Sequence, residues 1–208
     1  MLKFDRIYGK DVIFSAVNPG LVKTDIARNI TKVSTSKTLW EGMLIEFIQI
    51  AIVTGGNSGI GFETVKQLLN KNAKVYLCAR NPERANAAIA KLRDMNLPGT
   101  VEYLPLDLAS LDAIKSFADN YLSKEKTLDM LFNNAGVMNP TVGPETKDGY
   151  ELHVGTNSLG HHYLTKLLLP ALQASAQATP DRPPRVCFTS SLFCNILMDL
   201  WSYGCEVV

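Results

Sequence analysis

A glycine-rich stretch, TGGNSGIG at residues 54–61, combines residue types and a spacing that indicate phosphate binding. It follows the apolar run QIAIVT and precedes the helical pattern FETVKQLLNK. In that setting Gly55 permits a tight turn, Gly59 lets the backbone approach a pyrophosphate, and Gly61 lets the helix pack close to the strand. The amide groups at the helix N-terminus would attract the phosphates. The alternative is a glycine-bearing turn that binds no ligand.

Alternating strands and helices are predicted to hold this loop in place. Apolar runs indicate strands at 49–54, 73–79, 100–106, 128–134 and 185–190, and amphipathic patterns indicate helices at 62–71, 82–95, 110–124 and 150–177. Pro82 suits the first turn of its helix, and Ser110 or Asp112 is expected to cap the next one. Unbroken apolar strands that alternate with helices predict an α/β fold with a parallel sheet covered on both faces.

The composition excludes several classes of protein. The chain has 208 residues, 46% of them hydrophobic and 20% charged, with a net charge of +1. These values indicate a soluble globular domain and no electrostatic footprint for nucleic acid. The most apolar stretch, MLIEFIQIAIVT, is too short for a membrane span. Four cysteines without CxxC spacing favour a reduced, cytoplasmic setting. No metal site is predicted, because His153 and His161 have no carboxylate at ligand spacing.

Five motifs in a fixed order resemble one enzyme family. They are TGGNSGIG at 54–61, Asp107-Leu108, NNAG at 133–136, Asn157 and Ser190-Ser191. Together they resemble the short-chain dehydrogenase/reductase family, from Ala51 to about Ser191. The stretch GYELHVGTNSLGHHYLTKLLLPAL resembles its retinol-dehydrogenase-like, NADP-using branch. The resemblance implies a Rossmann-like, doubly wound parallel sheet.

The resemblance also implies a set of cofactor-binding residues. Asp107 would accept a hydrogen bond from the adenine amino group, with the backbone of Leu108 beside it. The remaining members come from the glycine loop and from the segment after the fourth strand of the alternation: Gly55, Asn57, Ser58, Gly59, Ile60, Gly61, Asn134, Ala135 and Gly136.

Arg80 decides the predicted choice of cofactor. It ends the second strand of the alternation, where an acidic residue would hold the ribose 2′-hydroxyl in an NAD enzyme. A guanidinium there suits the 2′-phosphate of NADP, and no acid occurs in LCARNP. The cofactor is therefore predicted to be NADP. The alternative for Arg80 is a solvated charge.

The catalytic set is incomplete. The family transfers a hydride between a nicotinamide and a carbonyl or alcohol carbon, while a tyrosine activated by a lysine four residues later transfers the proton. Ser191 matches the serine that bonds the substrate oxygen, with Ser190 as its rival, and Asn157 matches the asparagine that anchors a water relay. A loop serine and a helix-surface amide are the alternatives. None of the seven tyrosines is followed four residues later by lysine.

The order of the segments is rearranged relative to the family. VNPGLVKTD at 17–25 resembles the loop that normally follows the sixth strand, where Pro19, Gly20 and Thr24 would close over the nicotinamide. DVIFSAV at 11–17 would then be that sixth strand, lying parallel to RVCFTS although it comes first. We expect an incomplete Rossmann-like fold in three parts: residues 1–48, a dinucleotide-binding domain at 49–191 and an unassigned tail at 192–208.

Three interpretations of function follow. The chain is an NADP-dependent oxidoreductase acting on a small carbonyl or alcohol, impaired by the missing tyrosine and lysine; or a dinucleotide-binding module without turnover; or an inactive fragment that associates through exposed apolar surface. A homo-oligomer is a further option. The rearranged order itself is either genuine or the product of a gene model that joined pieces wrongly.

Overall fold

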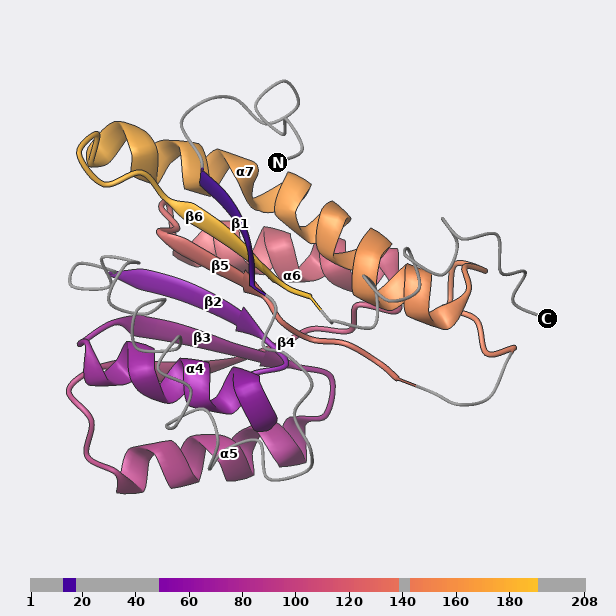
Figure 1. Ribbon diagram of the computed structural model, residues 1–208, viewed down its shortest axis with the longest axis horizontal. Coiled ribbons are helices and arrows are strands. Elements are labelled where there is room, and N and C mark those ends of the chain that lie inside the picture. The colour runs from indigo at the N-terminus through magenta and orange to yellow at the C-terminus, as the bar shows by residue number, and fades with distance from the viewer. Residues whose placement is uncertain (1–12, 18–48, 139–142, 191–208) are drawn as a thin grey trace, which may run out of the picture.

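A computed structural model describes residues 13–17, 49–138 and 143–190 of the chain. Six parallel strands form one sheet in the order β1-β6-β5-β2-β3-β4 (Figure 1). The strands are β1 (Ile13–Val17), β2 (Ile50–Thr54), β3 (Lys74–Ala79), β4 (Thr100–Pro105), β5 (Met130–Asn133) and β6 (Arg185–Thr189). The helices are α4 (Gly59–Asn70), α5 (Pro82–Asp94), α6 (Leu111–Lys124) and α7 (His161–Ala178), and a π-helical segment, η2 (Val154–Gly160), precedes α7. The predicted α/β class and parallel sheet are confirmed.

The earliest described strand in the sequence pairs with the latest. β1 lies parallel to β6 at the edge of the sheet, with Ile13 opposite Arg185 and Val17 opposite Thr189 (Figure 1). This confirms the parallel pairing predicted for DVIFSAV. Because parallel strands end at the same edge of a sheet, the carboxyl end of β1 lies beside that of β6.

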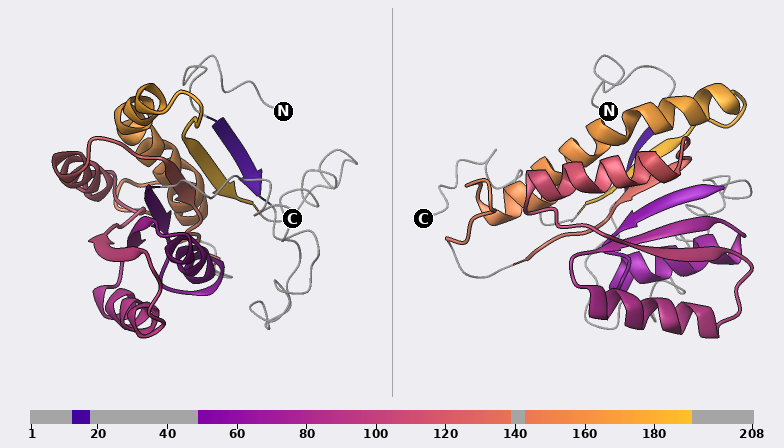
Figure 2. Two further views of the ribbon diagram at one scale, coloured as in Figure 1. Left: turned by 90° about the vertical axis from the view of Figure 1, so that its left-hand side faces the viewer. Right: turned by 180° about the vertical axis from the view of Figure 1, so that it is seen from behind.

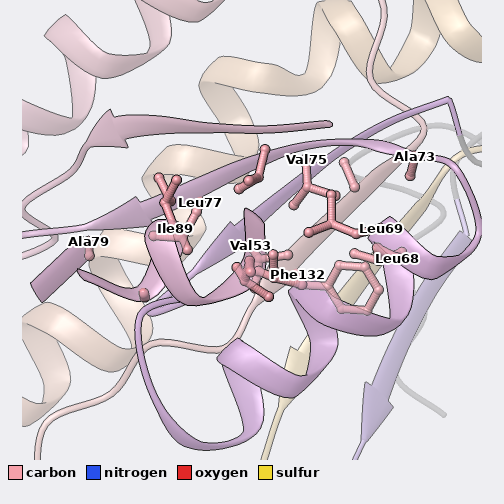
Figure 3. Close-up of a cluster of buried hydrophobic side chains, with 14 of the residues drawn as sticks. Val53, Leu68, Leu69, Ala73, Val75, Leu77, Ala79, Ile89 and Phe132 are labelled. Carbon is pink, nitrogen blue, oxygen red and sulfur yellow. The ribbon is translucent and has the colours of Figure 1, made fainter. Parts of the chain in front are cut away.

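Helices cover the two faces of the sheet in pairs. Figure 2 shows α4 and α5 on one side of the sheet and α6 and α7 on the other. The first pair packs on β2, β3 and β5 through a cluster that contains Val53, Leu69, Val75, Leu77 and Phe132 (Figure 3). A second cluster, under α6 and α7, contains the other faces of the same strands. Buried strands with apolar residues on both faces are what the unbroken apolar runs predicted.

Local signals explain where the helices begin. Asn81 caps α5 by accepting a hydrogen bond from the Arg84 amide at 2.8 Å, and Pro82 occupies the first turn as expected. Of the two candidates for α6, Ser110 is the cap, since its hydroxyl accepts from the Ala113 amide. The predicted single helix at 150–177 is wrong in detail, because its first part is π-helical over Val154–Gly160.

Polar side chains tie the amino ends of the strands together. Asp129, just before β5, accepts hydrogen bonds from the amides of Gln49 and Ile50, both at 2.9 Å, and from the Ser175 hydroxyl. These bonds fix the start of β2 against the start of β5 and the last turns of α7.

A second group at the same end links β3, β4 and α6. The Lys74 ammonium lies 2.8 Å from Glu125 and 3.2 Å from Glu102, and Tyr76 donates its hydroxyl to Glu125 at 2.7 Å. The hydrogen bond to Glu125 raises the pKa of Lys74, while burial raises the pKa of Tyr76 to about 12. Each of these groups has a protein partner, so the polar side chains of this group at the amino end of the sheet satisfy one another.

Candidate functional site

A pocket of about 460 Å³ lies at the opposite, carboxyl end of the strands. Its walls come from the segments that follow β2, β3, β4 and β5, together with residues of η2 and β6. The lining residues are Thr54, Gly55, Asn57, Ser58, Ile60, Gly61, Cys78, Ala79, Arg80, Asn81, Arg84, Leu106, Asp107, Leu108, Ala109, Asn134, Ala135, Gly136, Val137, Thr156 and Thr189. Most of the predicted cofactor residues are therefore brought together on one pocket.

The glycine loop forms the turn between β2 and α4. Gly55 has a φ of +66° and donates its amide to the Cys78 carbonyl at 2.8 Å. A Cβ at Gly61 would lie 2.3 Å from the Gly55 carbonyl oxygen, so only glycine permits this close packing of helix against loop. Gly59 also has a positive φ, +55°, but faces open space and does not line the pocket. Gly55 forms the tight turn that was predicted, while the close approach at Gly61 is to the loop and to Asn134 and not to the strand.

The N-terminus of α4 differs from those of the next two helices. Its cap residue, Ser58, makes no side-chain capping bond, and its first turn holds no acidic residue. In contrast, α5 and α6 are capped by side chains and carry Glu83 and Asp112 in their first turns. The amide groups of α4 thus keep their affinity for an anion at the pocket.

Two arginines lie at one part of this pocket. Arg80 follows β3, as predicted, and Arg84 lies in the first turn of α5. Both side chains are exposed. The capping bond between Asn81 and the Arg84 amide fixes the backbone that carries the second guanidinium. Arg84 was not foreseen; it lies in the first turn of the helix that was predicted to begin directly after Arg80 and Asn81.

Asp107 and Leu108 line the pocket beyond β4. One oxygen of the Asp107 carboxylate accepts from the Ala109 amide at 3.1 Å, and the other lies 3.4 Å from the Lys147 ammonium. Leu108 is buried. The turn thus presents a fixed carboxylate beside an apolar surface, which is suited to a flat, hydrogen-bonding ring.

The segment after β5 is held by Thr54. The Thr54 hydroxyl oxygen accepts the amides of Asn134 and Ala135, both at 2.9 Å. The Asn134 side chain donates to the Thr54 carbonyl at 3.0 Å and accepts from the Thr189 hydroxyl at 3.3 Å. These bonds connect the ends of β2, β5 and β6, so Asn134 and Thr54 hold the central strands together at this end of the sheet.

The Asn157 side chain lies behind the pocket-lining residues Gly136 and Val137, whereas its neighbour Thr156 lines the pocket. The Asn157 side chain accepts from the Val137 amide at 2.8 Å and donates to the Val137 carbonyl at 3.0 Å, and it does not line the pocket. Thr156 does line it, and its hydroxyl is buried without a hydrogen-bond partner among the described residues. A buried hydroxyl without a partner is costly, so Thr156 is a polar group at the pocket whose hydrogen bonding the described residues leave incomplete.

Four predicted site residues, Ser191, Pro19, Gly20 and Thr24, lie outside the described residues. Ser190, the rival of Ser191, follows β6 and does not line the pocket, whereas Thr189 does.

The described residues also show the state of two cysteines and allow a search for metal clusters and membrane-spanning helices. Cys78 and Cys187 are free and buried, and burial raises the pKa of both thiols. Within 13–17, 49–138 and 143–190, no cluster of His, Cys, Asp or Glu side chains is arranged to hold a metal ion. No helix in these ranges has the length and apolar character needed to cross a membrane.

Known proteins are similar to this chain in sequence and in architecture. The family model described as short chain dehydrogenase matches residues 49–201. A short-chain dehydrogenase/reductase of Armillaria gallica is 52% identical over 143 residues, which cover 69% of this chain and 45% of that protein. Retinol dehydrogenase 11 of Mus musculus is 42% identical over 144 residues, covering 69% and 43%.

A solved structure, the Pseudomonas aeruginosa RhlG/NADP active-site complex, has a TM-score of 0.58 and 30% identity, and the match covers 69% of this chain and 55% of that one. This chain spans about half the length of the relatives that it matches. The family resemblance indicated by the motifs is confirmed. The chain belongs to the short-chain dehydrogenase/reductase family and is similar to its retinol dehydrogenases.

Proposed function

We propose that this chain binds NADP(H) in the pocket at the carboxyl end of the sheet. The observation that carries the proposal is the pair of guanidinium groups, Arg80 and Arg84, on a pocket that also holds the uncapped N-terminus of α4. Two positively charged sites on one pocket suit a dinucleotide with a pyrophosphate and a further phosphate. The RhlG structure, a complex with NADP, supports the same cofactor class.

Individual residues fit this cofactor by their chemistry. Arg80 and Arg84 would hold the 2′-phosphate, and the loop at 55–61 would hold the pyrophosphate. Asp107 would accept from the adenine amino group, and Asn134, Ala135 and Gly136 would border the ribose. The Thr156 hydroxyl would gain the hydrogen-bond partner that it lacks.

Nucleotide titration tests the cofactor choice. NADPH should bind the purified 208-residue chain more tightly than NADH, as followed by nucleotide fluorescence, and Arg80→Asp should reverse the order. Arg93→Asp is a matched control, because Arg93 is an exposed arginine of α5 that does not line the pocket. Equal affinities of the unaltered chain for the two nucleotides would refute the proposal.

We further propose that turnover by this chain is weak. Bound NADP(H) would supply or accept the hydride, so the chain must position a small carbonyl or alcohol substrate and move the proton. Ser191 is proposed to bond the substrate oxygen, but the sequence contains no tyrosine–lysine pair to transfer the proton. General acid–base catalysis contributes about a hundred- to ten-thousand-fold. We therefore expect carbonyl reduction at least about a hundredfold below an intact relative.

A panel of carbonyl substrates with NADPH measures this directly. Turnover equal to that of an intact relative would overturn the proposed impairment. If Tyr203→Phe then abolished that turnover, Tyr203 would be the proton donor. NADPH binding with no detectable turnover would favour the second candidate function, a dinucleotide-binding module, which rests on the same missing pair.

The domain boundaries, the cellular location and the oligomeric state of the protein stay predictions. Residues 49–191 are proposed as the dinucleotide-binding unit, and residues 1–48 as the segment that supplies its edge strand. The parallel pairing of β1 with β6 supports this integrated arrangement over a loose fragment. A cytoplasmic location and a homo-oligomer are proposed on composition and family resemblance alone.

A further inference from the structure

His161 links three parts of the molecule from a buried position. It is the first residue of α7 and is 2% exposed. Its Nε2 lies 2.9 Å from the Thr54 hydroxyl at the end of β2, and its Nδ1 lies 2.9 Å from the Asn157 carbonyl oxygen in η2. Of these two partners, Thr54 lines the pocket and Asn157 does not. The Thr54 hydroxyl also holds the segment that follows β5.

The chemistry of the partners fixes the proton positions in this chain of bonds. A carbonyl oxygen can only accept, so Nδ1 of His161 must carry a proton. Burial lowers the pKa of His161 to about 4, so the ring is neutral at pH 7 and its Nε2 is an acceptor. The Thr54 hydroxyl therefore donates to His161.

The direction of the Thr54 hydroxyl matters for the loop. With its proton directed at His161, both lone pairs of the oxygen face the amides of Asn134 and Ala135, each at 2.9 Å. The competing acceptor, the Phe132 carbonyl, lies farther from the hydroxyl, at 3.2 Å. Without the histidine acceptor the hydroxyl would rotate toward Phe132, and the geometry of the two amide bonds would change.

Asn157 holds the same segment from its other side. Its side chain makes two bonds to the backbone of Val137, while its carbonyl accepts from His161. Residues 157 and 161 thus act on the segment 134–137 from both ends, one directly and one through Thr54.

We propose that His161 is a positioning residue, which orients the Thr54 hydroxyl and thereby sets the backbone of the segment 134–137 at the pocket. This inference rests on the proposed function in one respect, that the segment borders a bound NADP(H). The hydrogen-bond role itself does not depend on a nucleotide.

Two nucleotide-free measurements test the role first. ¹⁵N chemical shifts of the His161 ring should show the neutral Nδ1–H tautomer at pH 7. Amide hydrogen exchange at Asn134 and Ala135 should be slow in the unaltered chain and at least about tenfold faster in His161→Phe, which removes the acceptor that orients the Thr54 hydroxyl. Thr54→Val sets the upper limit, because it removes the oxygen that accepts both amides. An Nε2–H tautomer, or unchanged exchange in His161→Phe, would overturn the proposal.

NADPH titration then connects the role to the pocket. His161→Phe and Thr54→Val should each weaken binding about tenfold, and the double variant no more than either, since both interrupt one chain of bonds. Ser175→Ala is the control, because it removes a buried hydroxyl of the same helix at the far end of the sheet. Additive losses in the double variant would contradict the shared chain.

A conservative variant keeps the test decisive if His161→Phe does not fold. His161→Gln keeps an acceptor for Thr54 and should retain slow exchange at Asn134 and Ala135, whereas His161→Phe does not. If His161→Phe fails to fold, exchange in His161→Gln as fast as that in Thr54→Val would overturn the proposal. If the unaltered chain binds no NADPH while exchange responds as expected, the proposed function fails and the positioning role stands.

Discussion

The two ends of the sheet are both polar, but their polar groups differ: those at the amino end have protein partners, and those at the carboxyl end surround a pocket. At the amino end, Lys74, Tyr76, Glu102 and Glu125 satisfy one another, and Asp129 accepts from two amides and a hydroxyl. At the carboxyl end, α4 begins without a side-chain cap and Thr156 keeps a buried hydroxyl without a partner in the described part of the chain.

The difference shows how a structural polar network can be distinguished from a ligand site. Buried polar groups almost always find partners, and a satisfied network stabilises one conformation. Groups left without protein partners around one pocket lower stability unless a ligand binds there. We therefore expect substitutions at the amino end to lower stability and spare nucleotide binding, and removal of the hydroxyl without a partner at the carboxyl end to weaken nucleotide binding without lowering stability.

The largest effect is expected at Asp129. Asp129→Ala would leave two amides and the Ser175 hydroxyl without their acceptor, and should lower the free energy of unfolding by about 4 kcal/mol. Urea unfolding measures the loss, and the NADPH dissociation constant of the folded variant should stay within about twofold. Asp94→Ala, which removes an exposed carboxylate of α5, should change neither. A large loss of nucleotide affinity in Asp129→Ala would break the contrast between the two ends.

A pH series tests the buried histidine behind the carboxyl end. The pKa of His161 is about 4 in the folded chain and 6.5 ordinarily, so between these values the unfolded chain binds a proton that the folded chain does not. The free energy of unfolding should fall by about 3 kcal/mol as the pH is lowered from 6.5 to 4. Urea unfolding at several pH values measures this slope. His161→Gln should remove most of it, and an equal slope in that variant would assign the pH dependence to other groups.

Tyr76→Phe tests a single bond of the amino end. The hydroxyl donates to the Glu125 carboxylate at 2.7 Å, and the ring is 1% exposed. Loss of a hydrogen bond to a charged acceptor should lower the free energy of unfolding by about 2 kcal/mol. Thermal or urea unfolding checks the value, and NADPH affinity should be unchanged.

Thr156→Val is the matched change at the carboxyl end, with a smaller effect of opposite sign. Valine has nearly the same shape and removes the hydroxyl without a partner, so the free energy of unfolding should rise by about 1 kcal/mol. NADPH binding should weaken a few-fold, through loss of one hydrogen bond. A loss of stability in this variant would mean that the hydroxyl already has a protein partner, and the contrast with Tyr76 would fail.

Sequence patterns predicted the fold well and the site only partly. The strands and the glycine turn were predictable because apolar runs and loop chemistry are local signals, and the parallel partner of β1 was predictable from the resemblance to the family. Asn157 and Thr156 were not distinguished, because a helical pattern can show neither that η2 is π-helical nor which of the two residues lines the pocket.

Two other residues escaped prediction for different reasons. The helix that carries Arg84 was predicted from residue 82, but only the folded structure shows that its first turn lines the pocket. The sequence did not indicate the role of His161, because its partner Thr54 lies far away in the sequence and contacts it only in the folded structure.

The pairing of β1 with β6 has a consequence for biosynthesis. β1 is made first among the described elements, but its only hydrogen-bonded neighbour among the described strands begins at Arg185. At about 5–20 residues per second, a nascent β1 would wait on the order of 10 s or more for that neighbour to be translated. During that time its backbone groups are open to other strands, including those of neighbouring nascent chains. Closure of the sheet edge is then a late step with high contact order, and we expect it to be the slow one when the chain refolds.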